Sequence, residues 1–252
     1  MFKRSIRCLS AMTALVVPVS VLAAPPDLSG TWTIDGPRGL FKSVGENYQT
    51  EQLSLTPKYK EEHAAIIKQR GPSGGGNMAN CTPPGMPGMM NHGMMFEVLV
   101  TANRVTLLFE DGEVRRLYTD GRAHPAEEEL LPSFTGHSIA HWESDTLVVD
   151  TVGMREEAEL FLAGGQRVTA NTQIVERIGL NQAGEMEIAT EVIDPAIFTT
   201  PYRYSRIYVK AGVEMYEAGC SFANRDSESA VNLKPPVVEP LPNKTTSKKD
   251  RP

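Results

Sequence analysis

A long alternation of apolar and polar residues constrains this fold more than any other feature. It begins near Met94 and continues to Phe222. Such period-two runs, separated by short turns, are typical of antiparallel β-strands. The runs lie at 94–101, 104–110, 113–119, 137–143, 146–152, 168–180, 185–194, 202–210 and 215–222. Asp111-Gly112 and Ser144-Asp145 separate two of the pairs, as expected of tight hairpins.

Two further elements precede this region. Residues 27–34 form an opening strand, with Leu28, Trp32 and Ile34 on one face. Thr56 is a good N-cap and Pro57 suits a first helical position, so a helix is predicted at 57–69. A series of ten candidate strands needs two packed sheets or closure. The sequence therefore predicts a mainly β protein: a single antiparallel β-barrel or strongly coiled sheet of about 8–10 strands.

The first residues indicate export. Lys3, Arg4 and Arg7 precede a short apolar run, and the small residues Ala23-Ala24 follow it. This order is typical of a secretory signal peptide, predicted at 1–24, and gives a periplasmic or secreted bacterial location. The barrel domain is expected over 25–226, and a largely disordered tail with prolines and lysines over 227–252. No apolar run reaches the ~20 residues of a membrane-spanning helix.

Signal cleavage leaves Cys81 and Cys220 as the remaining cysteines. Two cysteines in an oxidising compartment most often form a disulfide, so this pair is predicted to be bonded.

Charge and motifs exclude several partners. The formal net charge is −6, which argues against nucleic acid and against anionic lipid surfaces. The chain has no phosphate loop and no dinucleotide fingerprint, so no cofactor is predicted. The expected partner is a small hydrophobic or aromatic molecule, and the oligomeric state stays open.

Two segments carry a family resemblance. They are Tyr-Thr-Asp-Gly-Arg-Ala-His-Pro at 118–125 and Gly-His-Ser-Ile-Ala-His-Trp-Glu-Ser-Asp-Thr-Leu-Val-Val-Asp-Thr at 136–151. Together with the opening Asp-Leu-Ser-Gly-Thr-Trp, the Leu-Thr-Pro helix start and the Cys-x-Pro-x-Gly-Met-Pro stretch, they resemble a family of secreted bacterial proteins without an assigned function. The resemblance covers most of 27–226 and departs at Ala123, Phe134, Ala140 and Ser144. It implies a β-barrel of broadly lipocalin-like build and brings no reaction.

Histidines mark the candidate catalytic site. His137 and His141 share one face of a predicted strand, and His124 lies in the preceding loop with Asp120. A histidine can move a proton at neutral pH when a carboxylate orients its ring. His137, His124 and Asp120 are therefore the candidate catalytic residues. The alternative is that these histidines are hydrogen-bonded structural residues. Their spacing matches no zinc motif, and no metal site is assigned.

The ligand-binding candidates are aromatic or cationic side chains expected at one end of the barrel. They are Tyr118, Arg122, His141, Trp142, Tyr204 and Arg206. Tyr202, Tyr204, Arg206 and Tyr208 share one strand face, which is predicted to point inward.

A methionine-rich loop at 78–95 offers a different chemistry. Thioethers, together with Cys81 and His92, are soft ligands that suit Cu(I). Methionine is also a flexible filler of apolar space.

Three functions follow. The first is an extracytoplasmic barrel that binds a small hydrophobic or aromatic molecule in its interior or mouth. The second is a cofactor-independent isomerase, lyase or hydratase on the same scaffold, with a histidine as general base. The third is a periplasmic copper-binding protein. The sequence does not decide whether the chain is an enzyme.

Overall fold

The computed structural model describes residues 24–34, 54–70, 82–91, 94–160 and 167–215. Several predictions fall wholly or largely outside these ranges. They are the signal peptide 1–24, the strand at 215–222, the tail 227–252 and the disulfide between Cys81 and Cys220. These stay predictions.

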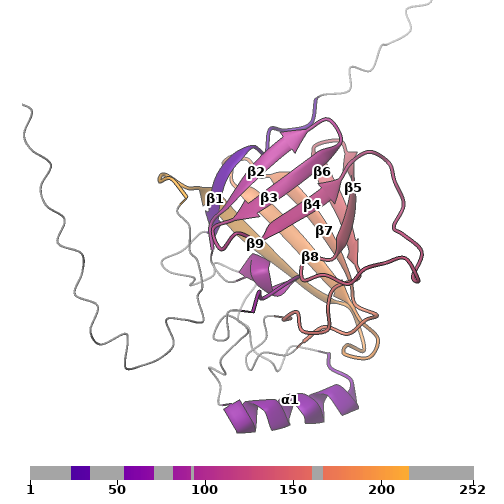
Figure 1. Cartoon of the computed structure of the whole chain (residues 1–252). Coiled ribbons are helices and arrows are strands. Elements are labelled where there is room, and N and C mark those ends of the chain that lie inside the picture. The colour runs from indigo at the N-terminus through magenta and orange to yellow at the C-terminus, as the bar shows by residue number, and fades with distance from the viewer. Residues whose placement is uncertain (1–23, 35–53, 71–81, 92–93, 161–166, 216–252) are drawn as a thin grey trace, which may run out of the picture.

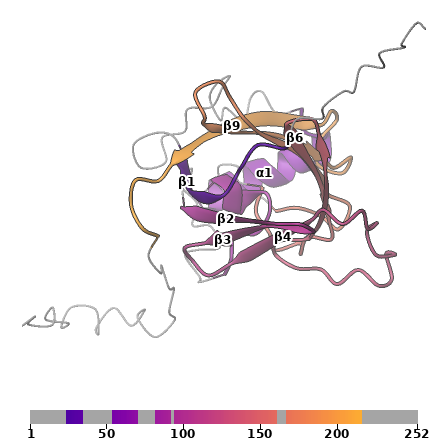
Figure 2. The same ribbon diagram turned by 90° about the horizontal axis from the view of Figure 1, so that it is seen from above.

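Nine strands of the described residues close into one barrel in chain order, seen from the side in Figure 1 and from above in Figure 2. They are β1 Gly30–Ile34, β2 Phe96–Thr101, β3 Arg104–Phe109, β4 Val114–Tyr118, β5 His137–Glu143, β6 Thr146–Val152, β7 Gln173–Leu180, β8 Met186–Ile193 and β9 Tyr202–Lys210. The barrel closes because β1 pairs with β2 on one side and with β9 on the other. The predicted mainly β barrel is confirmed.

One strand pair departs from the all-antiparallel order that the short turns predict. Strands β4 and β5 pair in parallel, through Leu117 with Ser138 and Tyr118 with Ile139. The connecting segment 119–136 is far longer than a hairpin turn, so the chain can return and run again in the same direction. The last residues of β4 therefore lie beside the first residues of β5.

Strand β7 also begins later than predicted, at Gln173 rather than 168. The hydroxyls of Thr169 and Thr172 both donate to Oδ2 of Asp194, at 2.7 and 2.5 Å. The backbone N–H of Thr172 donates to the Thr169 carbonyl at 3.1 Å. These bonds form a turn in place of the first residues of the predicted strand.

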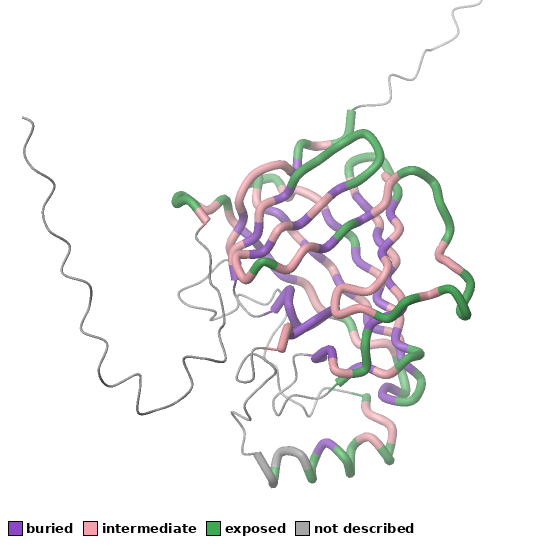
Figure 3. Tube along the Cα trace, viewed as in Figure 1, coloured by how far each residue is buried: buried purple, intermediate pink, exposed green. Residues whose placement is uncertain are grey.

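Alternate side chains of the strands fill the barrel, as the buried positions in Figure 3 show. Trp32 is fully buried, and its indole N–H donates to the Leu28 carbonyl at 2.9 Å. The Phe96 ring packs against Phe109 and Tyr208, with ring centroids 5.3 and 5.2 Å apart. The β9 row of Tyr202, Tyr204, Arg206 and Tyr208 alternates with exposed Arg203 and points inward, as predicted.

The barrel end nearer α1 is covered by segment 82–91, which contains the short helix η4 Gly88–Asn91 (Figure 1). Met86, Met89 and Met90 of this segment belong to the hydrophobic core. Two hydrogen bonds attach it to β9: the Tyr208 hydroxyl donates to the Met90 carbonyl, and Nδ2 of Asn91 donates to the Tyr204 hydroxyl at 3.0 Å. We call segment 82–91 the methionine plug.

The predicted helix is confirmed as α1 Pro57–Arg70, which lies beyond the plugged end of the barrel (Figure 1). Thr56 caps it, because its hydroxyl accepts the Tyr59 N–H at 3.3 Å and donates to the Ala196 carbonyl at 2.8 Å. The cap thus joins the helix start to the loop between β8 and β9. No helix among the described residues is long and apolar enough to cross a membrane.

Candidate functional site

The predicted histidines meet where segment 119–136 leaves β4 and returns as β5. The parallel pairing places Tyr118 at the end of β4 next to His137 at the start of β5. Their rings stack with centroids 5.4 Å apart and planes 28° apart. Leu117 and Ser138 are buried inside the barrel. Because strand side chains alternate, Tyr118 and His137 project from the outer wall.

A tight turn brings Arg122 onto this stack. The Asp120 carboxylate accepts Nε of Arg122 at 2.9 Å and its Nη2 at 2.5 Å, while Gly121 adopts a positive φ of 78°. The Arg122 guanidinium carbon then lies 3.9 Å from the centroid of the Tyr118 ring. The hydrogen bonds from Arg122 lower the pKa of Asp120, and Asp120 in turn raises the pKa of Arg122.

His124 and His137 are joined through their ring nitrogens. Nδ1 of His124 lies 2.8 Å from Nδ1 of His137, and the rings meet edge to face. One nitrogen must therefore carry the proton and the other must accept it. Burial lowers the pKa of His137, and the nearby His124 and Arg122 lower it further. The structure thus favours a neutral His137.

Asp150 of β6 stands on the other side of His124. Its Oδ2 lies 3.7 Å from Nε2 of His124, which is ion-pair range and longer than a hydrogen bond. Its Oδ1 accepts Nε2 of Gln173 from β7 at 2.8 Å. A row of polar groups therefore runs along the outer wall from Gln173 through Asp150 and His124 to His137. We call Tyr118, Asp120, Arg122, His124, His137 and Asp150 the histidine site.

The remaining sequence candidates lie elsewhere. His141 is on the same face of β5, about 13 Å further along the strand, where it is exposed and its Nε2 lies 3.2 Å from Glu143. Trp142, Tyr204 and Arg206 alternate inward and pack in the barrel. Arg206 lies with its guanidinium carbon 4.7 Å from the centroid of the Tyr204 ring. The residues predicted to form one site at the barrel interior or mouth thus lie in two places, some on the outer wall and some in the core.

Sequence reasoning missed a polar cluster inside the barrel. Arg115 of β4 and Glu176 of β7 form a buried ion pair, and Nη2 of Arg115 also donates to Oγ1 of Thr151 at 3.0 Å. The Ser138 hydroxyl lies 2.8 Å from the same Thr151 oxygen. The sequence did contain an indication of this cluster, because Glu176 lies two residues after the apolar Ile174 and so falls on the same, buried face of its strand.

Among the described residues, a small apolar cavity of about 10 Å³ lies inside the barrel, with roughly the room of one water molecule. Nine apolar side chains line this cavity: Leu28, Val98, Val105, Leu107, Leu117, Leu147, Ile178, Met186 and Ile188. An organic ligand does not fit there.

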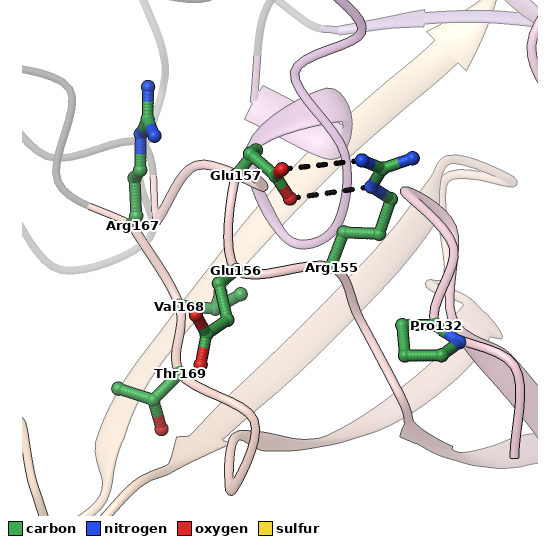
Figure 4. Close-up of a pocket in the computed structure, with 7 residues that line it drawn as sticks. All are labelled: Pro132, Arg155, Glu156, Glu157, Arg167, Val168 and Thr169. Atoms are coloured by element: carbon green, nitrogen blue, oxygen red, sulfur yellow. Dashed lines mark hydrogen bonds and ion pairs between the residues drawn. The ribbon is translucent and has the colours of Figure 1, made fainter.

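Two larger grooves lie on the surface. One, of about 720 Å³, runs between segments 155–157 and 167–169 beside Pro132. Figure 4 shows Arg155 and Glu157 paired on one side of it, and Arg167 directed away from them. The other, of about 460 Å³, crosses β7, β8 and β9 between Arg177 and Arg203 and includes the candidate Tyr204. Neither is lined by a member of the histidine site.

The described part of the methionine loop has a packing role. Met86, Met89, Met90 and Met94 are all buried. Within the described ranges, no group of three or more His, Cys, Asp or Glu side chains is arranged to hold a metal ion. Met78, Cys81 and His92, which the copper hypothesis also uses, lie outside those ranges.

Comparison with protein-family models and with curated proteins finds no match to this chain.

Proposed function

We propose that this chain is an extracytoplasmic β-barrel protein that binds a small aromatic molecule bearing a carboxylate or hydroxyl group, and that the ligand occupies the histidine site. The observation that carries this proposal is the contact series of Arg122, Tyr118 and His137 on the outer wall. Arg122 and His137 each contact the Tyr118 ring, and these three flat, partly exposed side chains offer surfaces against which an aromatic ring can stack.

The surrounding groups suit such a ligand. Ile139 lies on the outer face in register with Tyr118 and Asp150, and adds an apolar contact. A guanidinium has further N–H donors beyond the Nε and Nη2 that Arg122 gives to Asp120, so Nη1 can meet a ligand carboxylate. Nε2 of His137 makes no hydrogen bond with the described residues and can accept one from a ligand hydroxyl.

The outer wall is preferred to the barrel interior because Arg122, Tyr118 and His137 are partly exposed to solvent there. The described apolar cavity inside the barrel has about 10 Å³, which is far below the roughly 300–1,000 Å³ of pockets for drug-sized molecules. Binding inside would require the methionine plug and its core contacts to move. The closed barrel of the described strands is compatible with a lipocalin-like build.

The extracytoplasmic location rests on the signal peptide predicted at 1–24. Expression with export, followed by intact-mass analysis, should give a chain that begins after Ala23 or Ala24. The same spectrum, taken with and without reductant, tests whether Cys81 and Cys220 are bonded. A full-length mass in the cell lysate would contradict export.

The binding test uses para-hydroxybenzoate as the probe and isothermal titration calorimetry on the purified chain. We expect saturable binding whose affinity falls at least tenfold in Arg122→Gln. In NMR spectra of the wild type, the ring resonances of His137 and Tyr118 should shift when the probe is added. Arg155→Gln is the matched control. Arg155 forms a similar short-range pair with Glu157 and lies 5.0 Å from the Phe134 ring, with 47% of its side chain exposed against 45% for Arg122. Equal loss in both variants, or shifts confined to other residues, would reject the site.

A second candidate function uses the same residues as a proton-transfer site. The observation that favours it is the row from Gln173 through Asp150 and His124 to His137. A carboxylate near Nε2 of His124 favours a proton on that nitrogen, so Nδ1 of His124 accepts and Nδ1 of His137 donates. Nε2 of His137 is then the acceptor that a general base requires.

Nitrobenzisoxazole is a suitable probe of a general base. A base removes its C–H proton, the N–O bond breaks, and a coloured cyano-nitrophenolate forms without any cofactor. Wild type should accelerate this elimination beyond free imidazole at equal concentration, and His137→Gln should abolish the excess. His141→Gln, which alters an exposed histidine away from the site, should retain it. A rate equal to that of free imidazole would leave ligand binding as the sole function of the site.

A further inference from the structure

Segment 119–136 is attached to the barrel near both of its ends and in its middle. Near its ends, the Thr119 N–H donates to the Asn103 carbonyl at 3.0 Å and the Ser133 N–H donates to the Gly153 carbonyl at 3.1 Å. In the middle of the segment, between residues 120 and 129, His124 forms a hydrogen bond to His137 of the barrel wall. Figure 1 shows this segment projecting from the side of the barrel. The middle of the segment is therefore held by this imidazole pair, together with the Arg122 guanidinium on the Tyr118 ring and the approach of His124 to Asp150.

The proton count decides whether that pair can hold. With both rings neutral, one Nδ1 donates and the other accepts across 2.8 Å. Adding one proton to the pair still leaves one Nδ1 as an acceptor. Adding a second places an N–H on both facing nitrogens and puts two cations in contact, so no hydrogen bond remains.

We propose that His124 and His137 form a proton-operated latch, which holds segment 119–136 on the barrel while at least one ring is neutral and releases it when both are charged. The latch concerns the attachment of the segment and does not depend on which ligand the histidine site takes. Release would take Arg122 away from the Tyr118 ring and His124 away from His137.

The groups nearest the imidazole pair come from β4, β6, β7 and the segment itself. Asp150 on β6 lies 3.7 Å from Nε2 of His124. Arg122 lowers the pKa of His137, and Asp120 is paired with Arg122. Tyr118 on β4 and Gln173 on β7 are uncharged. Glu127, Glu128 and Glu129 are exposed in the segment.

The direction of the pH effect follows from His137. Its pKa is lowered when the segment is attached, first by burial and then by His124 and Arg122. A released histidine titrates near its ordinary value of about 6.5. The released state therefore binds more protons below that pH, so attachment is complete above it and is lost as the pH falls.

The experiment is amide hydrogen exchange of the full exported chain at about pH 7.5 and about pH 5.5. The lower pH is above the ordinary pKa range of exposed carboxyl groups, so these groups stay charged in both measurements. Rates are corrected with an unstructured peptide of the same sequence. We expect the protection of amides in 119–129 to fall at least tenfold at the lower pH, while the β5 and β6 amides of Ala140 and Val149 keep theirs.

Two variants isolate the pair. His137→Gln cannot carry the second charge, so its segment should show the same protection at both pH values. His141→Gln removes an exposed histidine of the same strand and should behave as wild type. A pH dependence that persists in His137→Gln would overturn the latch. If a variant fails to fold, NMR of the imidazole nitrogens in the wild type reports the charge of both rings instead. Two charged rings in a protein whose segment 119–136 keeps its protection would also overturn the proposal.

Discussion

Arg115 and Glu176 are joined across the inside of the barrel, although their strands β4 and β7 are not neighbours in the sheet. Nη1 of Arg115 donates to Oε1 of Glu176 at 3.1 Å, and Nη2 contacts the second carboxylate oxygen. Both side chains are essentially fully buried. Thr151 of the intervening strand β6 accepts a further hydrogen bond from Arg115. The pair therefore fixes two walls of the barrel relative to each other.

Removing one member of this pair should be strongly destabilising. Arg115→Met leaves the Glu176 carboxyl buried without its cationic partner, and breaking a buried pair in this way costs about 3–5 kcal/mol. The double variant Arg115→Met/Glu176→Leu removes both charges and should recover most of that loss. Urea unfolding of the three proteins measures the difference.

The exposed pair of Arg203 and Glu191 on the outer wall is the control. Arg203→Met should cost less than about 1 kcal/mol, because water screens an exposed pair. A double variant no more stable than Arg115→Met would show that the buried cluster contributes through its hydrogen bonds to Thr151 rather than through paired charge.

Two glycines of segment 119–136 should respond differently to alanine. Gly136 has a φ of 67°, and an added Cβ would lie 2.8 Å from the Val152 carbonyl oxygen. Gly121 has a φ of 78° and open space around it. Gly121→Ala should therefore cost only the left-handed backbone penalty of roughly 1–2 kcal/mol, and Gly136→Ala should cost more. Equal unfolding midpoints would show that the start of β5 can shift without loss.

Local features of the fold were predictable, and distant ones were not. The alternation and the caps depend on residues close in sequence, so the nine described strands, the hairpin at Asp111-Gly112 and helix α1 lie near their predicted positions, with β7 starting later than predicted. The parallel pairing of β4 and β5 depends on where a long segment returns, which no local pattern specifies. The same limit applies to Arg115 and Glu176, because their contact requires the curvature of the finished barrel.

The candidate site shows the same difference between local and distant features. Asp120, Arg122, His124 and His137 belong to one segment and its return strand, so their proximity could be expected from the sequence. Asp150 joins them through the β5–β6 register, in which it pairs with Ile139. The sequence predicts Trp142, Tyr204 and Arg206 as ligand-binding residues because aromatic and cationic side chains can line the interior or mouth of a barrel. Whether it is hollow depends on how the methionine plug and the wall side chains fill it, which composition does not show.

Alkaline pH should destabilise the barrel through its inward tyrosines. Burial raises the pKa of Tyr202 to about 12, and raises the pKa values of Tyr204 and Tyr208 further, with Tyr208 donating to the Met90 carbonyl. A raised folded pKa gives stability that is complete below the unfolded value of about 10 and is lost as the pH rises above it. One pH unit above that value, each such tyrosine should cost about 1.4 kcal/mol.

Urea midpoints at about pH 8 and about pH 11 test this, with tyrosinate absorbance followed in parallel. The double variant Tyr204→Phe/Tyr208→Phe should lose less stability between the two pH values than wild type does. A tyrosinate signal that reaches its full amplitude near pH 10 in the folded protein would show that the inward tyrosines are accessible to water.

The methionine plug should stabilise the barrel by packing rather than by ligand chemistry. Met89 is almost fully buried in the hydrophobic core, so Met89→Ala should cost about 2–5 kcal/mol through the cavity it leaves. Met89→Leu conserves volume and removes the thioether, so it should cost less than about 1.5 kcal/mol. Unfolding of the three proteins in urea, each with and without added Cu(I), separates the two roles. If Cu(I) raises the midpoint of wild type and not that of Met89→Leu, the sulfur of Met89 is a copper ligand and packing is not its main role.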